Sequence, residues 1–416
     1  MSDAAGATVE ELLRLKSRYL VPCVYHFYRQ PPHLVRGRGC HLFDVAGRRY
    51  LDCYGGVTVM NAGHCNPEII EPAIAQVRRL QHTTGIYLTE PVLRLAEALA
   101  RIAPGGLCRS FFTASGSEAV EGALLLAGLH TRRPEVVAAT GGLHGRTRWA
   151  MNVTGLDLWR TDPFPLPGVH HVPFGDADAL AGLLDRRADQ IAAFIAEPVQ
   201  GNGGIRIPPP DYWPAVRRLC DQYGVLLVMD EVQTGFGRTG RWFAGQHWNV
   251  APDVLVLSKA LGNGFPIAAF MTTDDIAASY TRPGASTYGG NPVSAAAALA
   301  VIEYHRRHRL AERSRELGVH LLEGLTLLAG RSARLADPRG LGLMAAVDVV
   351  DEKGAPDPAG LDRLLEDLKD RGYLCGKTGA GRNALTFMPP LVIERTDLDG
   401  LLEALSEAVV SLEMKS

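Results

Sequence analysis

Two charged side chains stand directly after runs of apolar residues that have the length of buried strands. Asp230 ends the run VLLVMD, and Lys259 follows the run VLVLS. An ionised group in such surroundings costs free energy unless it has a partner. Burial also lowers the pKa of a lysine, so that its free amine can act as a nucleophile toward an aldehyde. Taken alone, however, a lysine at the end of a strand is usually a solvated side chain.

A second segment has the pattern of a phosphate site. In ASGSEAVEGALLLAGL, residues 114–129, Gly116 and Ser117 stand just before a strong helical pattern. The start of a helix offers free backbone N–H groups and the positive end of the helix dipole, and two serine hydroxyls stand beside them here. This combination favours phosphate binding, although a serine that only caps the helix would give the same pattern.

Together these groups match three parts of one cofactor. An aldehyde would meet Lys259, a protonated ring nitrogen would meet Asp230, and a phosphate would meet Gly116 and Ser117, as pyridoxal 5'-phosphate (PLP) requires. The neighbouring carboxylates Asp230 and Glu231 could instead bind a metal or cap a helix. No His or Cys set with metal spacing stands near them, so we expect no metal site.

The elements that would position these groups alternate along the chain between about residue 107 and residue 275. Short, continuous apolar runs such as IAAFIAEP and VLVLSK alternate with helical patterns such as WPAVRRLCDQYG. Continuous apolarity is typical of strands buried on both faces, which predicts a mostly parallel sheet covered by helices. Ligands of such sheets bind at the carboxyl ends of the strands, where Glu197, Asp230 and Lys259 stand.

The flanking regions predict a smaller α+β domain. The segment GRGCHLFDVAGRRYLD, residues 37–52, has the pattern of a hairpin with a turn at Gly47. After residue 305, strand-like and helical patterns alternate, and a final amphipathic helix begins at Thr396. We therefore expect an N-terminal segment, 1–58, that packs with a C-terminal small domain, 306–416, and a large domain, 59–305, between them.

The composition narrows the partners and the compartment. Among 416 residues, 43 Lys and Arg balance 45 Asp and Glu, and no basic cluster predicts binding to nucleic acid or to a membrane surface. The acidic N-terminus lacks the pattern of a signal peptide, and no run of about 18 apolar residues predicts a membrane span. Seven cysteines without a CxxC pair are typical of a reduced, cytoplasmic protein.

Several segments, in this order, resemble the class III aminotransferases, which are PLP-dependent enzymes of fold type I. They are GSEAVEGALLLA, GGLHGRT, AEPVQGNGG, MDEVQTGFGRTG, LSKALGNGFP and STYGGNP. The N-terminal RYLDCYGGVTVMNAGHCNPEI and the C-terminal MPPLVI match as well, so the resemblance covers nearly the whole chain. Within this family, the motif sequences are most similar to those of the branch that includes alanine-glyoxylate aminotransferases. The resemblance implies an α/β fold, with a mostly parallel sheet in the large domain and a smaller α+β domain.

The resemblance assigns cofactor roles to residues of these motifs. Lys259 would form the Schiff base with PLP and shuttle the proton, and Asp230 would keep the ring nitrogen protonated. Val232 would pack against one face of the ring, and Gln233 would hydrogen-bond the phenolic oxygen. Glu197 would support these groups near the ring.

Further residues bind the phosphate and the substrate in this family. Gly116 and Ser117 would bind the phosphate together with Thr287 from the partner subunit. That role implies a homodimer with shared active sites. Tyr54 to Val57 would line the substrate pocket.

Three positions depart from the family's pattern. Leu143 replaces an aromatic residue that usually stacks on the ring, which predicts weaker cofactor retention unless His144 takes over the stacking. Asn202 and Thr386 replace a Glu and an Arg that pair in glutamate-using members, where the Arg binds the substrate's α-carboxylate. Losing both partners leaves no unpaired buried charge. These departures favour a neutral or differently charged substrate in a specialised, biosynthetic role.

An arginine remains as a candidate ligand for a substrate carboxylate. Arg146, in HGRT, stands at the position that binds such a group in several relatives. Arg206 and Arg282 are weaker candidates for the same role, because an arginine in such a position is more often a surface residue than a ligand.

These observations predict a PLP-dependent aminotransferase. Lys259 would move an amino group from an amine or amino acid to an oxo acid, aldehyde or ketone by a ping-pong mechanism. The same residues would also serve a PLP-dependent phospho-lyase, an aminomutase or a decarboxylase, because the cofactor motifs stabilise the carbanion common to all of them. A PLP-binding protein without catalysis is a third class, but such a protein usually lacks the lysine or the aspartate.

Overall fold

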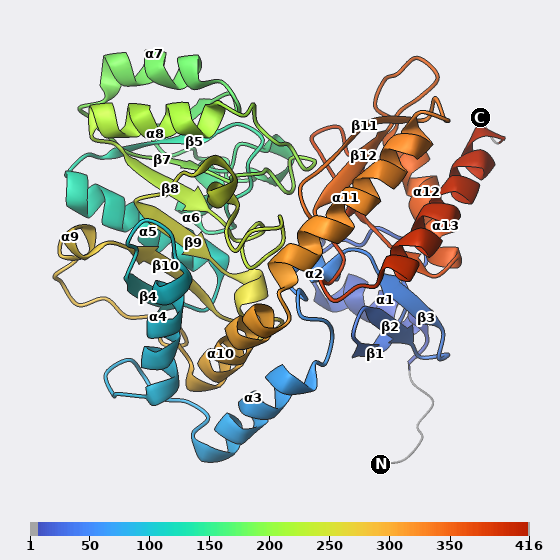
Figure 1. The fold of residues 1–416 in the computed structure, drawn as a ribbon, viewed down its shortest axis with the longest axis horizontal. Helices are drawn as coiled ribbons and strands as arrows, with labels where there is room; N and C mark the ends of the chain where they lie inside the picture. The colour runs from blue at the N-terminus through green and yellow to red at the C-terminus, as the bar shows by residue number, and fades with distance from the viewer. Residues whose placement is uncertain (1–6, 415–416) are drawn as a thin grey trace.

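The computed structural model describes residues 7–414, and a seven-stranded sheet forms the centre of the larger lobe (Figure 1). Its strands, in spatial order, are β4 (Arg109–Thr113), β10 (Ala268–Thr272), β9 (Val254–Leu257), β8 (Leu226–Asp230), β7 (Ile191–Ala196), β5 (Glu135–Ala139) and β6 (Val169–Val172). β10 runs antiparallel to both of its neighbours, and the remaining strand pairs are parallel. The predicted α/β fold with a mostly parallel central sheet is therefore confirmed.

Helices cover both faces of this sheet because its strands are apolar on both sides. One face packs against α4 (Glu90–Ile102), α7 (Ala177–Arg187), α8 (Tyr212–Tyr223) and α10 (Pro292–Arg307). The other face packs against α5 (Gly116–Thr131), α6 (Arg148–Asn152) and α9 (Asp274–Ala277). Successive strand residues serve opposite layers, as Leu227 and Val228 of β8 do.

Two four-stranded sheets form the smaller lobe. One has the order β1 (Leu34–Arg38), β2 (His41–Asp44), β3 (Arg49–Asp52) and β13 (Tyr373–Leu374). The other has the order β11 (Leu335–Gly340), β12 (Ala345–Val349), β15 (Ala384–Phe387) and β14 (Gly376–Thr378). β2 and β3 form the predicted hairpin, and Gly47 adopts a φ of 80° in its turn.

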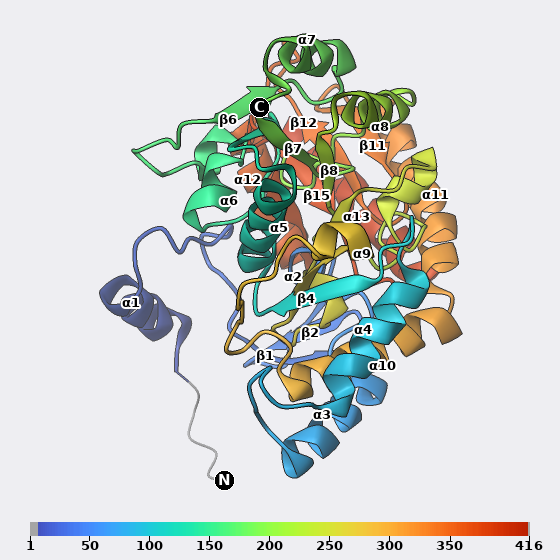
Figure 2. The same ribbon diagram turned by 90° about the vertical axis from the view of Figure 1, so that its left-hand side faces the viewer.

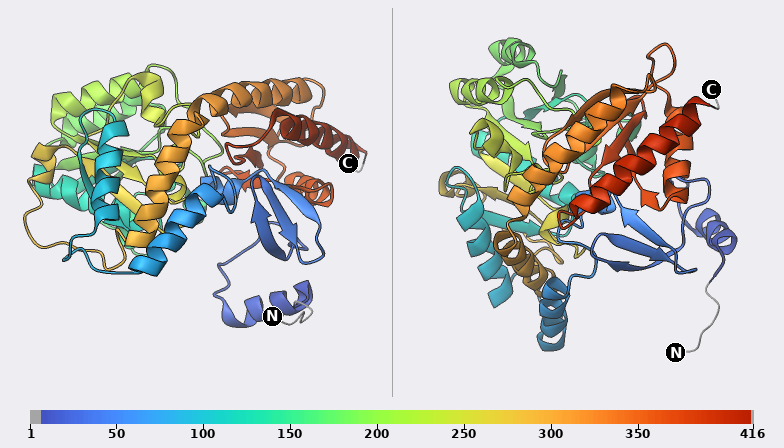
Figure 3. Two further views of the ribbon diagram at one scale, coloured as in Figure 1. Left: turned by 60° about the horizontal axis from the view of Figure 1, so that its bottom comes forward. Right: turned by 45° about the vertical axis from the view of Figure 1, so that its right-hand side comes forward.

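The N-terminal strands and the C-terminal region share one core. β13 pairs in parallel with β3, which joins residues 51–52 of the N-terminal segment to residues 373–374 of the C-terminal region. Residues near β3 belong to the same hydrophobic cluster as residues of α11 (Leu310–Ala329), α12 (Pro358–Asp370) and α13 (Arg395–Glu413). α11 and α13 lie side by side along this lobe (Figure 3).

The remaining elements connect these layers or lie outside them. α1 (Val9–Tyr19) has no buried residue and stands away from the body of the chain (Figure 2). α2 (Gly55–Thr58), α3 (Pro67–Arg79) and the 3-10 helices η1 (Asp157–Trp159), η2 (Ala244–Trp248) and η3 (Lys259–Leu261) complete the set of elements. Among residues 7–414, no helix is both long and apolar enough to cross a membrane. Residues 1–6 and 415–416 of the predicted terminal regions lie outside the described residues.

Candidate active site

Asp230 and Lys259 lie at one edge of the central sheet. Asp230 is the last residue of β8, and Lys259 comes two residues after the end of β9, the parallel neighbour of β8. Lys259 begins η3 with a φ of 46°, in the left-handed region that non-glycine residues rarely adopt. Such backbone conformations are common at functional sites, where the surrounding structure holds them in place.

A cavity of about 440 Å³ opens at this edge of the sheet. The predicted site residues in its lining are Gly116, Ser117, Leu143, His144, Arg146, Glu197, Asp230, Val232, Gln233 and Lys259. Further lining residues include Val59, Trp159, Ser258 and Phe265. The fold thus gathers the end of β8, the residues that follow β7 and β9, the start of α5 and the loop before α6 around one space.

The carboxylate of Asp230 has two partners. His144 Nδ1 lies 2.7 Å from Asp230 Oδ2, and the backbone N–H of Val232 donates to Oδ1 at 3.0 Å. Burial lowers the pKa of His144, but the hydrogen bond and charge of Asp230, with the charge of Glu197, outweigh burial and raise this pKa above 6.5. His144 is therefore a partner of Asp230, a contact that the sequence did not predict.

Glu197 is held by backbone groups behind this pair. Its Oε1 accepts from the N–H of Leu143 at 2.9 Å, and its Oε2 accepts from the N–H of Gly201 at 3.0 Å. Burial raises the pKa of Glu197 to about 7, and the charge of His144 opposes that rise. The residue that follows the strand end of β7 is thus a buried carboxyl group that titrates near neutral pH.

The surroundings of Lys259 change its acidity in the opposite direction. Burial lowers the pKa of Lys259 to about 8, although the charges of Glu197 and Asp230 oppose this shift. A large fraction of the amine is therefore neutral near pH 8. Only the neutral amine can act as a nucleophile or accept a proton.

The N-terminus of α5 forms another side of the cavity. Ser115 and Glu118 make a capping box, in which Ser115 Oγ accepts from the N–H of Glu118 at 3.3 Å. The N–H groups of Gly116 and Ser117, at the first two positions, have no acceptor within the helix. Ser117 Oγ accepts from the backbone N–H of Arg146 at 3.0 Å, which leaves its own hydrogen available to an anion.

Two glycines make room for these side chains. A Cβ at Gly145 would lie 2.5 Å from Ser117 Oγ, and a Cβ at Gly201 would lie 2.5 Å from Gln233 Oε1. A larger residue at either position would displace a group that lines the cavity.

The lining also contains buried polar atoms that lack a partner. Gln233 Oε1 and His144 Nε2 have none among the described residues. An unpaired buried polar atom costs roughly 1–3 kcal/mol, which a polar ligand could recover. An amine at Lys259, a carboxylate at Asp230 and free N–H groups at the start of α5 accompany them. These groups fit the aldehyde, ring nitrogen and phosphate of PLP.

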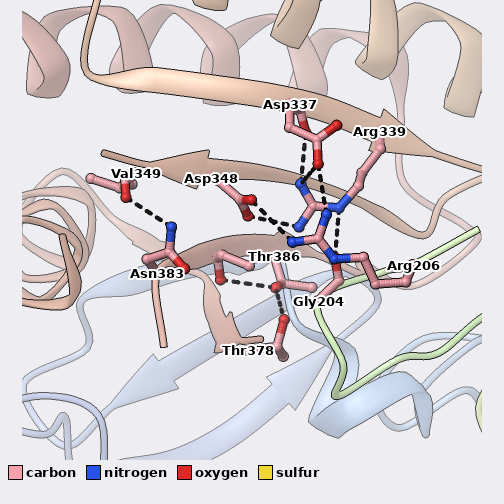
Figure 4. A network of polar contacts seen from close by, with 10 residues as sticks. Gly204, Arg206, Asp337, Arg339, Asp348, Val349, Thr378, Asn383 and Thr386 are labelled. Atoms are coloured by element: carbon pink, nitrogen blue, oxygen red, sulfur yellow. Dashed lines mark hydrogen bonds and ion pairs between the residues drawn. The ribbon is translucent and has the colours of Figure 1, made fainter. Parts of the chain in front are cut away.

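Arg146 is the arginine of the cavity lining, and its guanidinium has no ion pair or hydrogen bond within residues 7–414. Arg206, in contrast, is not available as an alternative clamp. Its Nη1 lies 2.6 Å from Asp337 Oδ2, and its Nη2 lies 3.2 Å from Asp348 Oδ2 (Figure 4). Arg339 binds the same two carboxylates, so these charges neutralise one another between the lobes.

Thr386 and Asn202 do not line the cavity. Thr386 is fully buried in β15, where its Oγ1 lies 2.7 Å from Thr378 Oγ1 and donates to the carbonyl of Ala384 at 3.1 Å (Figure 4). The backbone carbonyl of Asn202 accepts from the N–H of Gly379 at 2.9 Å. Thr386 is thus a neutral, buried residue bonded within its own sheet, and the contact of Asn202 with the other lobe is made by its backbone.

Tyr54 and Val57 also lie outside the lining, in a strained turn next to it. All four residues of α2 have φ between 57° and 64°, so this element is a left-handed turn. Two of them, Val57 and Thr58, are β-branched, which makes the conformation costly. The turn leads directly to Val59, which does line the cavity.

Thr287 and Arg282 lie together in the loop between α9 and α10. Both are exposed, and neither lines the cavity of its own chain. The phosphate role of Thr287 and the clamp role of Arg282 therefore find no contact within the described chain.

Trp159 lines the cavity but was not predicted from the sequence. It stands in η1, within the segment GLDLWRTDPF, which has neither helical nor strand periodicity. The one signal in the sequence was that Trp159 is a tryptophan, a residue type that occurs five times in the chain. Its position at the cavity follows only from the fold.

Comparisons with known proteins agree with this geometry. The family model described as aminotransferase class III matches residues 28–409. The mitochondrial alanine-glyoxylate aminotransferase 2 homolog 2 of Arabidopsis thaliana is 38% identical over 420 residues, which cover 96% of this chain and 87% of the relative. The acetylornithine aminotransferase of Methanothermobacter thermautotrophicus is 38% identical over 407 residues, which cover 97% of this chain and 99% of the relative.

A solved structure has the same fold. The ornithine aminotransferase of Toxoplasma gondii superimposes with a TM-score of 0.91 at 29% sequence identity. The match covers 99% of this chain and 97% of the other.

Proposed function

Since this chain belongs to the class III aminotransferases and is a PLP-dependent transaminase, we propose that Lys259 is its catalytic lysine. When bound, PLP supplies the electron sink for a carbanion at the reacting carbon. Lys259 Nζ would take the proton from Cα of the amino donor and later return a proton to the cofactor. The observation that carries this proposal is the placement of Lys259 beside Asp230 and Glu197, where burial lowers the lysine pKa to about 8.

Each of the other lining residues has one task in this proposal. Asp230, oriented by His144, would hold a proton on the ring nitrogen. Gly116 and Ser117 would bind the phosphate. Gln233 would hydrogen-bond the phenolic oxygen, Val232 would pack on the ring, and Glu197 would support Leu143 through the backbone hydrogen bond described above. Leu143 would face the ring in place of an aromatic residue.

The substrate is bound in part by charge. Arg146 lines the cavity and has no side-chain partner among the described residues, so we propose that it binds the carboxylate of the amino donor or acceptor. Tyr54 and Val57 would act on the substrate indirectly, through the turn before Val59. Asn202 and Thr386 would act through the residues that they hold, Gly379 and Thr378.

A homodimer with shared sites is also proposed. The loop that carries Thr287 lies beside the loop before α4, because Asn291 Nδ2 donates to the carbonyl of Gln81 at 3.2 Å. The side chains of these two loops include Ile86, Tyr87, Leu88 and Tyr288, which are 66–88% exposed. Such an apolar surface is typical of a protein interface. There, Thr287 of the partner subunit would complete the phosphate site.

The division into residues 1–58, 59–305 and 306–416 remains our proposal for the domains. The pairing of β13 with β3 and the shared hydrophobic cluster support it. A cytoplasmic location and a biosynthetic role are proposed with it. The location is supported by seven cysteines that are all free.

Two measurements test the proposed function. Borohydride reduction of the PLP-loaded enzyme, followed by digestion and mass spectrometry, should find the pyridoxyl group on Lys259. A panel of amines tested against pyruvate, glyoxylate and 2-oxoglutarate should yield the amino product of at least one acceptor. Release of ammonia without amino transfer would support the lyase, which the comparisons do not favour.

A further inference from the structure

Trp159 begins a series of aromatic contacts that leads away from the cavity. Its ring centroid lies 6.1 Å from that of Tyr25, and the Tyr25 ring lies 5.8 Å from Phe27. Phe27 meets the ring of Tyr54 edge-on at 5.8 Å. Four rings from three distant segments therefore form one aromatic cluster, which reaches the space that Arg146 lines through Trp159.

The N-terminal part of this cluster is fixed to C-terminal elements. The hydroxyl of Tyr28 donates to the carbonyl of Cys375 at 3.2 Å, and Lys369 Nζ donates to the carbonyl of Gln30 at 3.3 Å. These anchors hold the segment in place although Tyr25 itself is 50% exposed. Its ring thus offers apolar surface at a defined position next to the cavity.

The residues that contact Tyr54 on the neighbouring wall are uncharged. Tyr54 packs so closely on β14 that a Cβ at Gly376 would lie 2.1 Å from its Cε2. Gly376 pairs with Thr386 across the sheet, and the hydroxyls of Thr386 and Thr378 bind each other. Burial raises the pKa of Tyr25 and the charge of Arg382 opposes this rise, so a cationic substrate end would meet a like charge on this side.

The aromatic rings and Arg146 together indicate which chemical groups a substrate should carry. We propose that Trp159 and Tyr25 select substrates whose reacting carbon carries an aromatic or similarly large apolar group, with a carboxylate, where present, at Arg146. Covering exposed rings removes apolar surface from water and adds ring contacts. The inference rests on the transaminase function proposed for the same cavity. A cationic substrate end could also bind aromatic faces, so a diamine belongs in the test.

Binding of unreactive acids tests the inference without turnover. Isothermal titration of the PLP-loaded enzyme should show that 3-phenylpropionate binds at least roughly tenfold more tightly than propionate. Trp159→Ala should reduce this ratio to about twofold, and Trp159→Phe should retain most of it. Phe164→Ala, which changes a 71% exposed ring five residues away, should leave the ratio unchanged. If Trp159→Ala weakened the binding of both acids by the same factor, Trp159 would have a structural role and the proposal would be overturned. An unchanged affinity for each acid would overturn it as well.

Single-turnover reactions separate this inference from the proposed function. The loss of the cofactor's aldehyde-form absorbance is followed with 1-phenylethylamine, alanine and ornithine as donors. We expect the phenyl-bearing amine to have the largest second-order rate constant, and Trp159→Ala to lower that constant about tenfold while alanine changes less than about twofold. Faster reaction of ornithine, or reaction of alanine without an advantage for the aromatic amine, would overturn the inference alone. No reaction with any donor would overturn the proposed function as well.

Discussion

At the proposed cofactor end of the site, Asp230 and His144 are buried in a 2.7 Å contact near the buried Glu197. At the proposed substrate end, the guanidinium of Arg146, which lines the same cavity as Trp159, has no partner within residues 7–414. The first end is closed and internally paired before any ligand arrives. The second leaves a charge and an aromatic surface for a substrate. Buried charges must be paired to be tolerated, whereas groups that face a substrate need no internal partner.

This difference explains why one end of the site can be predicted from the sequence and the other cannot. Burial restricts Asp230 and Lys259 to strand ends that meet at one sheet edge, so the proposed cofactor end has short, local motifs. The proposed substrate end is assembled from Tyr25, Trp159 and Arg146, which no local pattern connects. If this account is correct, mutations at the first end should abolish the reaction, and mutations at the second should change which substrates react.

Removal of the lysine should have the largest effect. Lys259→Ala is expected to lower kcat for every substrate by at least about 10³-fold, because a positioned acid–base group contributes about 10²–10⁴-fold. Steady-state transamination assays measure this loss. Lys353→Ala, at an exposed position, is the matched control and should keep full activity. Residual activity within tenfold of the wild type would assign the chemistry to another residue.

Arg146→Ala should distinguish substrates. A charge-assisted hydrogen bond is worth about 1.5–3 kcal/mol, so KM for carboxylate substrates should rise about 10- to 100-fold. Amines without a carboxylate should keep their KM. Arg148→Ala changes an exposed neighbour that is paired with Asp162 and should leave both values unchanged. Equal KM values for wild type and Arg146→Ala would remove Arg146 from the substrate site.

The smallest expected effect concerns Leu143. Aromatic stacking adds about 0.5–1.5 kcal/mol, so Leu143→Phe should tighten cofactor binding by roughly two- to tenfold. Leu143→Met provides a flexible, non-aromatic control of similar size, and it should bind the cofactor as the wild type does. Equilibrium titration of the cofactor-free proteins with PLP measures both. A tighter cofactor in the Met variant alone would contradict a stacking effect.

Much of the fold could be predicted because the amino-acid pattern of each strand identifies it without reference to distant residues. Continuous apolar runs identified β7, β8 and β9, and the end of each run marked a residue that now lies at the cavity. The order of the motifs identified the family. These predictions succeeded where the physical requirement, burial on both faces of a sheet, acts on adjacent residues.

The remainder depended on contacts between distant segments. The sequence leaves Arg206 as a candidate clamp because it does not show the two partners of this side chain. Those partners, Asp337 and Asp348, lie more than a hundred residues later in the chain. The bond between His144 and Asp230 likewise joins residues 86 positions apart. Trp159 stands in an irregular segment, so its place at the cavity depended on the fold alone.

The central claim is that burial of Lys259 keeps its amine reactive although the charges of Glu197 and Asp230 favour the protonated form. Competitive acetylation of the cofactor-free protein over a range of pH, with each lysine quantified by mass spectrometry, measures this directly. Only a neutral amine is acetylated, and burial lowers the pKa of Lys259 from 10.5 to about 8. We predict half-maximal labelling of Lys259 near pH 8. A midpoint near the ordinary lysine value of about 10.4 would contradict the account.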